Sequence, residues 1–167
     1  MSQHPSHRRV RAAGRSPGTA LASVLVVEDD RATAEMIEIV LGGQGLAVHV
    51  CPRGEPAVAM AQRVEPVVAL VDLLLPDLGG AHVCRAIRAN AATPIVTMSA
   101  ARDPELIAAA AAAGAADHLV KPFTMQQLVG CVSAHLPDAA LPGMVRAPKL
   151  DARPSSASIA ESIIPRH

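Results

Sequence analysis

The fold is decided by the stretch Val67-Val68-Ala69-Leu70-Val71-Asp72, in which an unbroken apolar run ends on a carboxylate. A run of β-forming residues without polar alternation is typical of a strand that is buried on both faces of a parallel sheet. Open α/β sheets carry their functional sites beyond the carboxyl ends of their strands, and Asp72 stands at that end. The stretch therefore predicts a central strand that delivers a functional carboxylate to the edge of a sheet.

A second predicted strand also ends in acidic residues. The apolar residues 24–27 are followed directly by Glu28, Asp29 and Asp30. Neighbouring carboxylates repel one another unless they are protonated or bound to a cation, and hard divalent cations prefer oxygen ligands of this kind. We therefore expect a divalent cation site where the two strands end. Asp30 is interpreted as a charge in the first turn of the next helix, where the helix dipole favours it.

The rest of the chain alternates between strand and helix patterns. The expected strands are 24–27, an edge strand at 46–51, 67–72, 95–99 and 116–120. The expected helices that lie between and after them are 31–41, 54–64, 81–89, one that begins at Pro104 behind a cap at Asp103 or its neighbour, and 124–136. Strand-then-helix units in strict alternation predict an α/β fold, a doubly wound parallel sheet with right-handed crossovers and helices on both faces.

These elements fill residues 23–136, a length that suits one compact domain. Residues 1–22 are basic and carry no acid, and residues 137–167 are rich in Pro, Ala and Ser. We expect the first to be a disordered basic arm and the second a disordered tail. Lys plus Arg equal Asp plus Glu at 15 each, so the overall charge favours neither nucleic acid nor a membrane surface as a partner. No helix-turn-helix pattern follows residue 136, and direct DNA binding is not expected.

The cysteines and the hydropathy pattern are typical of a cytoplasmic protein. Cys51, Cys84 and Cys131 lie far apart and form no CxxC pair, so we expect reduced thiols in the core. No apolar stretch approaches the roughly 20 residues that a membrane helix requires. His49 is expected on the exposed face of the edge strand.

The predicted strand ends bring together Glu28, Asp29, Asp72, Ser99 and Lys121. Asp72 can attack phosphorus in line as a carboxylate nucleophile. The three carboxylates can hold Mg²⁺, which offsets the charge on phosphoryl oxygens. Ser99 can donate a hydrogen bond to the phosphoryl group, and Lys121 can place a positive charge beside it. Each residue taken singly could be a helix cap or a surface residue, so the prediction of phosphoryl transfer to Asp72 depends on their convergence.

Four motifs of this chain resemble the receiver domain of two-component response regulators. They are VLVVEDD at 24–30, VDLLLP at 71–76, PIVTMSA at 94–100 and GAADHLVKPF at 114–123. The likeness covers about residues 23–136, and its weight comes from the four motifs standing in the family's order and spacing.

The resemblance implies a flavodoxin-like sheet with the strand order 2-1-3-4-5. It implies that a histidine kinase or a histidine phosphotransfer protein phosphorylates Asp72. It also implies a cis peptide bond between Lys121 and Pro122, which the family uses to aim the lysine. The implied ligands of Mg²⁺ are Glu28, Asp29, Asp72 and the main-chain carbonyl of Leu74.

The sequence departs from the family pattern at several positions. His118 stands where the family usually has an aromatic residue, most often Tyr, that moves together with the hydroxyl of Ser99 as a switch. Imidazole is smaller and titrates near neutral pH, so we hypothesise a pH-sensitive or incomplete switch, the alternative being a core histidine without that role. Leu74 and Ala101 cannot orient an attacking water, which predicts a long-lived aspartyl phosphate. The alanines at 108–113 replace the charged pairs of the family's common dimer face, and they suit close packing with a partner or simply reflect composition.

We therefore expect a single-domain response regulator that signals to an unidentified downstream protein by protein contacts. It would be a phosphoacceptor regulatory domain that assists its own phosphoryl transfer, not an enzyme. Two alternatives stay open. The first is a phosphotransfer intermediate, and the second is a receiver-like binding module that acts without phosphorylation.

Overall fold

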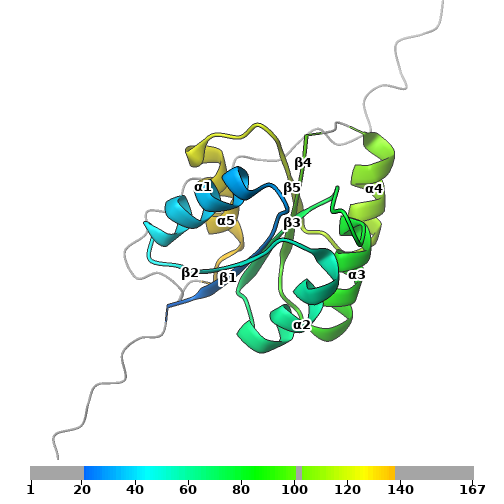
Figure 1. The fold of residues 1–167 in the computed structure, drawn as a ribbon, viewed down its shortest axis with the longest axis horizontal. Coiled ribbons are helices and arrows are strands. Elements are labelled where there is room, and N and C mark those ends of the chain that lie inside the picture. Colours follow the sequence, from blue (N-terminus) through cyan, green and yellow to red (C-terminus); the bar gives the residue numbers. More distant parts are fainter. Residues whose placement is uncertain (1–20, 101–102, 138–167) are drawn as a thin grey trace, which may run out of the picture.

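The computed structural model describes residues 21–100 and 103–137, and within them a parallel sheet has the strand order β2-β1-β3-β4-β5 (Figure 1). The strands are β1 (Ser23–Val27), β2 (Ala47–Cys51), β3 (Val68–Asp72), β4 (Ile95–Ser99) and β5 (Asp117–Val120). The helices are α1 (Arg31–Gly42), α2 (Gly54–Val64), α3 (Gly80–Asn90), α4 (Pro104–Ala112) and α5 (Met125–His135). The flavodoxin-like α/β fold and its strand order are confirmed.

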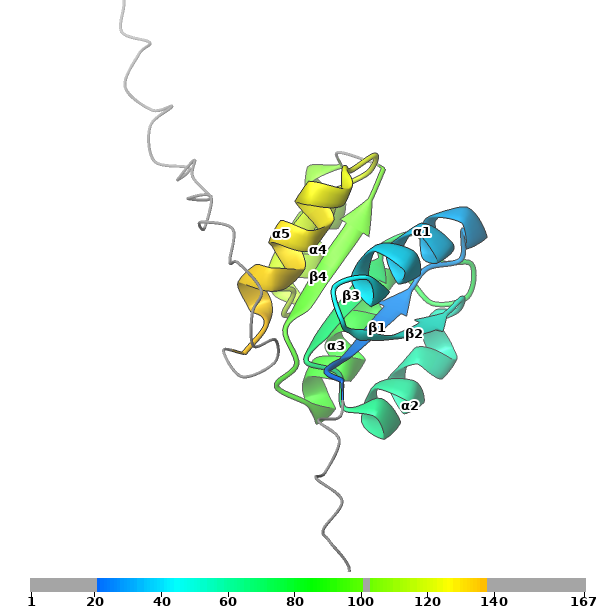
Figure 2. The ribbon, with the colours of Figure 1, turned by 90° about the vertical axis from the view of Figure 1, so that its left-hand side faces the viewer.

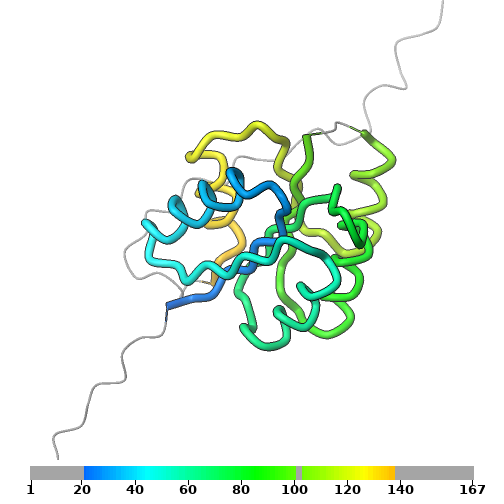
Figure 3. Tube along the Cα trace, in the orientation of Figure 1, coloured from blue at the N-terminus to red at the C-terminus, as the bar shows by residue number. Residues whose placement is uncertain are grey.

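The central strands are buried because both of their faces are covered. All residues of β3 and β4 are buried, as the unbroken apolar runs of the sequence predict. β1 and β3 are separated in the sequence by α1, β2 and α2, yet they lie side by side in the sheet (Figure 3). β2 is an edge strand and most of its residues are half-buried, again as predicted.

The two faces of the sheet carry separate cores, to which β1 contributes alternate residues. Val24 and Val26 pack with residues of α1 and α5, whereas Leu25 and Val27 pack with residues of α2 and α3. Figure 2 shows α1 and α5 together on one side of the sheet. The doubly wound arrangement with helices on both faces is therefore confirmed.

Several boundaries and exposures differ from the predictions. α3 begins at Gly80, one residue early, because its first turn folds back onto the end of β3 through a Gly80 N to Leu73 O hydrogen bond of 3.1 Å. The prediction that His49 is exposed is wrong: its side chain is half-buried and lies 3.4 Å from Ser23 Oγ of the adjacent strand. Cys51 and Cys84 are core thiols as predicted, but Cys131 is only half-buried.

Some predictions fall on parts of the chain outside the described residues. These are the basic arm apart from its last residues, the Pro/Ala/Ser tail apart from Pro137, and Ala101. None of the helices in the described part of the chain has the length and apolar character to cross a membrane.

Candidate functional site

The candidate site lies at the carboxyl ends of the strands. Asp72 is the last residue of β3, Glu28 and Asp29 follow β1, and Lys121 follows β5. The strand ladder continues past the formal strand ends, because Leu73 N donates to Met98 O and Lys121 N donates to Ser99 O, both at 2.9 Å. This backbone pairing fixes the positions from which the site side chains project.

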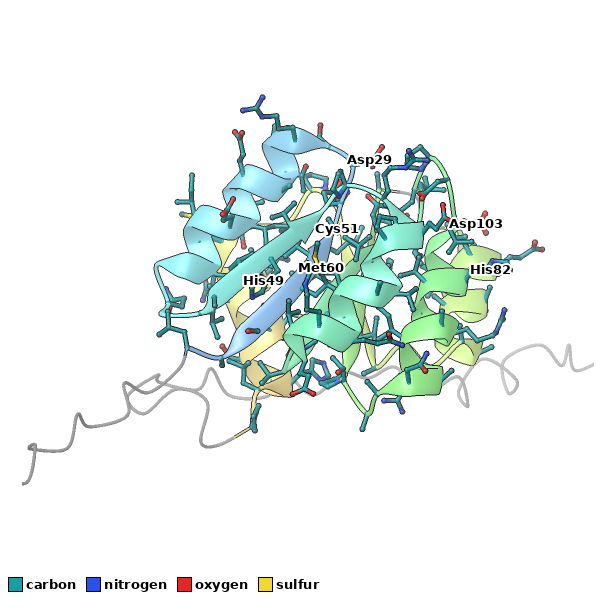
Figure 4. The ribbon with its side chains drawn as sticks, turned by 60° about the horizontal axis from the view of Figure 1, so that its bottom comes forward. Asp29, His49, Cys51, Met60, His82 and Asp103 are labelled. Atoms are coloured by element: carbon teal, nitrogen blue, oxygen red, sulfur yellow. The ribbon has the colours of Figure 1, made fainter. Side chains whose placement is uncertain are left out.

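The three carboxylates come together as the sequence predicts. Glu28, Asp29 and Asp72 each place an oxygen atom within 4.8 Å of the others. Glu28 and Asp72 are only 1% and 6% exposed, whereas Asp29 is exposed at the edge of the cluster (Figure 4). His49 lies further back along β2 in the same view, away from this end of the sheet. The site therefore has two shielded acids and one that faces solvent.

Lys121 is the positive charge of this cluster. Its Nζ lies 2.6 Å from Glu28 Oε2 and also donates a hydrogen bond to Asp72 Oδ2. Burial opposes the charge of Lys121, but the hydrogen bonds and charges of Asp72 and Glu28 outweigh it and raise the lysine pKa. The peptide bond from Lys121 to Pro122 is cis, as the family resemblance implies.

The cluster has more negative than positive charge when its acids are ionised. Burial raises the pKa of Glu28, while the hydrogen bond and charge of Lys121 act in the opposite direction. Three carboxylates facing one lysine leave room for a second cation, and hard oxygen ligands of this kind suit Mg²⁺. Leu74, the fourth implied ligand, is held beside the cluster because its N–H donates to Asp72 Oδ1 at 2.7 Å. The donor set therefore fits Mg²⁺.

Ser99 and His118 lie on the strands next to this cluster. Ser99 is fully buried at the end of β4, between the strands that carry Asp72 and Lys121. His118 does not project freely into solvent: its Nδ1 lies 2.9 Å from the hydroxyl of Thr97, a buried residue of β4. The Thr97 hydroxyl donates to Asp117 O at 3.2 Å, so its oxygen is left to accept a hydrogen bond from His118 Nδ1–H.

Burial of the ring favours a neutral imidazole. His118 Nε2 is buried without a hydrogen-bond partner among the described residues. Burial lowers the pKa of His118, and the nearby Asp117 carboxylate only partly opposes that effect. The sequence singled out His118 but not Thr97, because their contact depends on the β4–β5 register, which pairs the two residues.

Two residues that support the site were not singled out from the sequence. Asp77, in the loop after β3, accepts hydrogen bonds from Gly54 N at 2.9 Å and Glu55 N at 3.0 Å. These bonds lower the pKa of Asp77 to about 2, and they tie the loop to the first turn of α2. At Gly80 a Cβ atom would lie 2.3 Å from Asp72 O, so only glycine allows α3 to pass this close to the phosphoacceptor residue. The sequence indicates a loop at Gly79-Gly80, but it does not show which groups Asp77 and Gly80 contact.

Comparison with known proteins agrees with this geometry. The family model described as "Response regulator receiver domain" matches residues 24–133. The DNA-binding response regulator MtrA of Mycolicibacterium paratuberculosis is 39% identical over 113 residues, which are 68% of this chain and 50% of that protein. The cell cycle transcriptional regulator CtrA of Caulobacter vibrioides is 35% identical over 112 residues, or 66% of this chain and 48% of that protein. The chain thus spans about half the length of these curated relatives.

Solved structures show the same likeness. The Vibrio cholerae chemotaxis protein CheY4 aligns with a TM-score of 0.67 and 30% identity, covering 70% of this chain and 100% of the other. The BeF3-activated receiver domain of Klebsiella pneumoniae RstA aligns with a TM-score of 0.64 and 28% identity, covering 68% and 97%.

Proposed function

This chain belongs to the response regulator receiver domain family, and from that membership we propose that Asp72 accepts a phosphoryl group from a histidine kinase or a histidine phosphotransfer protein. The observation that carries the proposal is the position of Asp72, a residue that is 6% exposed and whose carboxylate accepts hydrogen bonds from both Leu74 N and Lys121 Nζ. A carboxylate held in this way can attack without first losing orientational freedom.

In the proposed reaction, a carboxylate oxygen of Asp72 forms a bond to phosphorus as the bond from phosphorus to the donor's imidazole nitrogen breaks. Lys121 supplies a fixed positive charge beside the phosphoryl oxygens, and it already lies against both Asp72 and Glu28. Ser99, at the end of the neighbouring strand, donates a hydrogen bond to the phosphoryl group. Mg²⁺ held by Glu28, Asp29, Asp72 and the Leu74 carbonyl would offset the remaining negative charge.

Signalling then follows from a shift between two states of the domain. The new charge at the strand ends favours one state, and Ser99 and His118 form the path from the site to the last strands. We propose that a downstream protein recognises that state through contacts with the receiver domain. Leu74 has an exposed apolar side chain, which supports a long-lived aspartyl phosphate because it cannot orient water for hydrolysis.

The test is intact mass spectrometry after incubation with Mg²⁺ and acetyl phosphate. We expect a phosphoryl adduct on the wild type and none on Asp72→Asn. An adduct on both proteins would contradict Asp72 as the acceptor. No adduct on either, with both proteins folded, would favour the binding module that acts without phosphorylation. Rapid passage of the phosphate to a histidine phosphotransfer protein would favour the phosphotransfer intermediate.

A second candidate function is control of a DNA-binding output. The printed names of the relatives MtrA and CtrA favour it, since they describe a DNA-binding response regulator and a transcriptional regulator. The two candidates differ in one measurement, the retention of the phosphorylated chain by random-sequence DNA at low and moderate salt. Retention that falls steeply with salt and depends on Asp72 would favour the second candidate.

A further inference from the structure

A second group of metal-ligating side chains lies at the opposite end of β5 from Lys121. Asp117 is the first residue of β5, whereas Lys121 follows its last residue. At a rise near 3.3 Å per residue, four residues of strand separate the two positions by roughly 13 Å. Cys131 and His135 stand one turn apart on α5, on the face that meets β5. This group takes no part in the proposed phosphoryl transfer.

The three side chains point at one another. Cys131 Sγ lies 3.6 Å from Asp117 Oδ2, and His135 Nε2 lies 3.4 Å from the same oxygen. All three ligand atoms lie within 4.8 Å of one another. The other oxygen of Asp117 accepts a 2.8 Å hydrogen bond from His118 N, and this bond fixes the direction of the carboxylate. The three possible metal-ligand atoms are therefore oriented before any ion binds.

The two distances from Asp117 Oδ2, to Cys131 Sγ and to His135 Nε2, match the spacing of ligands around one tetrahedral ion. With bonds to zinc near 2.3 Å for sulfur and near 2.0 Å for nitrogen and oxygen, neighbouring ligands lie about 3.2–3.6 Å apart. A thiolate, an imidazole and a carboxylate together select a borderline-soft cation rather than Mg²⁺, whose preferred ligands are all oxygens. We propose that Asp117, Cys131 and His135 form a zinc-binding site with its fourth position open to water.

The charge and exposure of the three residues are consistent with ion entry. Their side chains are reachable from solvent, since Asp117 is 46% exposed and His135 is 21% exposed. Among the described residues, the ion-pair partner of Asp117 is His135, and no lysine or arginine pairs with this carboxylate. The alternative is a simple packing contact, in which a thiol and a histidine hydrogen-bond to one surface carboxylate.

Zinc binding at this site releases a proton. Burial and the neighbouring Asp117 carboxylate raise the pKa of the Cys131 thiol to about 12, so without metal the sulfur keeps its hydrogen near neutral pH. On binding, the S–H bond breaks, a sulfur–zinc bond forms and the proton passes to solvent. Because the ion joins β5 to α5 and holds Asp117, it also restrains the segment that leads into His118.

The test is titration of the full chain with Co²⁺, a coloured substitute for Zn²⁺. We expect one cobalt ion per chain to give a sulfur-to-cobalt charge-transfer band in the near ultraviolet and strong visible bands typical of tetrahedral coordination, whereas cobalt held by the carboxylates at the other end of β5 gives no sulfur band. Cys131→Ser is expected to abolish the sulfur band, and His135→Gln and Asp117→Asn to weaken cobalt binding at least tenfold. Added Zn²⁺ should bleach the bands of the wild type.

Two control variants identify the site. Cys51→Ala removes a buried thiol at the end of β2 and should leave the cobalt bands unchanged. Asp72→Asn removes the phosphoacceptor and should also keep them, which separates this proposal from the proposed function. The proposal is wrong if the wild type gives no sulfur band, or if Cys131→Ser, folded by circular dichroism, retains it. If Cys131→Ser does not fold, His135→Gln with an intact band and unchanged affinity overturns the proposal.

Discussion

The two ends of β5 carry clusters that are built differently, although each holds a carboxylate next to a strand. At the carboxyl end, Lys121 lies between the buried acids Glu28 and Asp72, so the cluster contains its own cation. At the amino end, Asp117 faces a thiol and an imidazole. The first cluster thus suits a hard cation and a phosphoryl group, and the second suits a softer cation.

The largest effect on the first cluster is expected when its positive charge, Lys121, is removed. Lys121→Met should slow phosphorylation by acetyl phosphate about 100-fold, because one fixed charge beside the phosphoryl oxygens is lost. The time course of the phosphoryl adduct by intact mass gives the rate. Arg31→Met is the matched control, since Arg31 is a highly exposed cation at the start of α1 that pairs with Glu35. Equal rates for wild type and Lys121→Met would show that the lysine only balances charge in the resting protein.

The space for an added side chain also differs between the surroundings of the two clusters, and glycine-to-alanine substitutions measure this difference in packing. In Gly80→Ala the new Cβ would lie 2.3 Å from Asp72 O and 2.6 Å from Leu73 Cα. We expect the free energy of unfolding to fall by about 1–3 kcal/mol, as in other overpacked sites. Gly130 lies on α5, and a Cβ there meets nothing within 4 Å. Gly130→Ala should therefore stabilise the protein by about 0.4–1 kcal/mol.

Urea unfolding of both variants measures these effects, with Gly79→Ala as the control for the loop before α3. A Cβ at Gly79 has no neighbour within 4 Å, and the backbone there has a φ of −55°, which alanine adopts without strain. The expected order of stability is Gly130→Ala, then wild type and Gly79→Ala, then Gly80→Ala. Gly79→Ala stays level with the wild type because Gly79 is the N-cap of α3, where glycine is preferred to alanine, and this offsets the entropic gain. A Gly80→Ala protein as stable as the wild type would mean that α3 can move away from β3 at little cost.

The sequence predicts the first region better than the second for a physical reason. Glu28, Asp72 and Lys121 each follow an apolar strand, and parallel strands bring their ends together whatever their detailed register. The contact of Cys131 with Asp117 depends in addition on the phase of α5 and on its position over β5. Neither quantity can be read from spacing, so the sequence showed the two residues only as an isolated thiol and as an acid within a predicted strand.

Asp77 illustrates the same limit within the first region. Its partner Gly54 N is 23 residues away in the sequence and belongs to α2. The sequence therefore shows an acid in a loop but not the helix that this acid caps. Boundaries were predicted to within about one residue where glycine or proline marks them, as at Pro104 behind its Asp103 cap. The Thr97 partner of His118 required the β4–β5 register, which apolar runs without polar alternation leave undetermined.

The smallest expected effect concerns His118, which lies between the two clusters. Burial lowers its pKa below the usual 6.5, so the folded protein binds a proton there less readily than the unfolded chain does. The stability contributed by the neutral imidazole is therefore complete above pH 6.5 and is lost as the pH falls from 6.5 toward the lowered pKa. Two groups face the ring: the Thr97 hydroxyl at Nδ1, and the Asp117 carboxylate, which moderates the effect.

His118→Gln can keep a hydrogen bond to Thr97 but cannot titrate, so its urea unfolding free energy should fall less between pH 7 and pH 5 than that of the wild type. His82→Gln, which alters an exposed histidine of α3, is the matched control and should follow the wild-type curve. If His118→Gln shows the full wild-type pH dependence, the imidazole does not set it, and the hypothesis of a pH-sensitive switch loses its basis. If the pH dependence is reduced, the same two proteins test the switch directly. The conformational change caused by phosphorylation with acetyl phosphate should then differ in extent between the wild type and the variant as the pH is lowered.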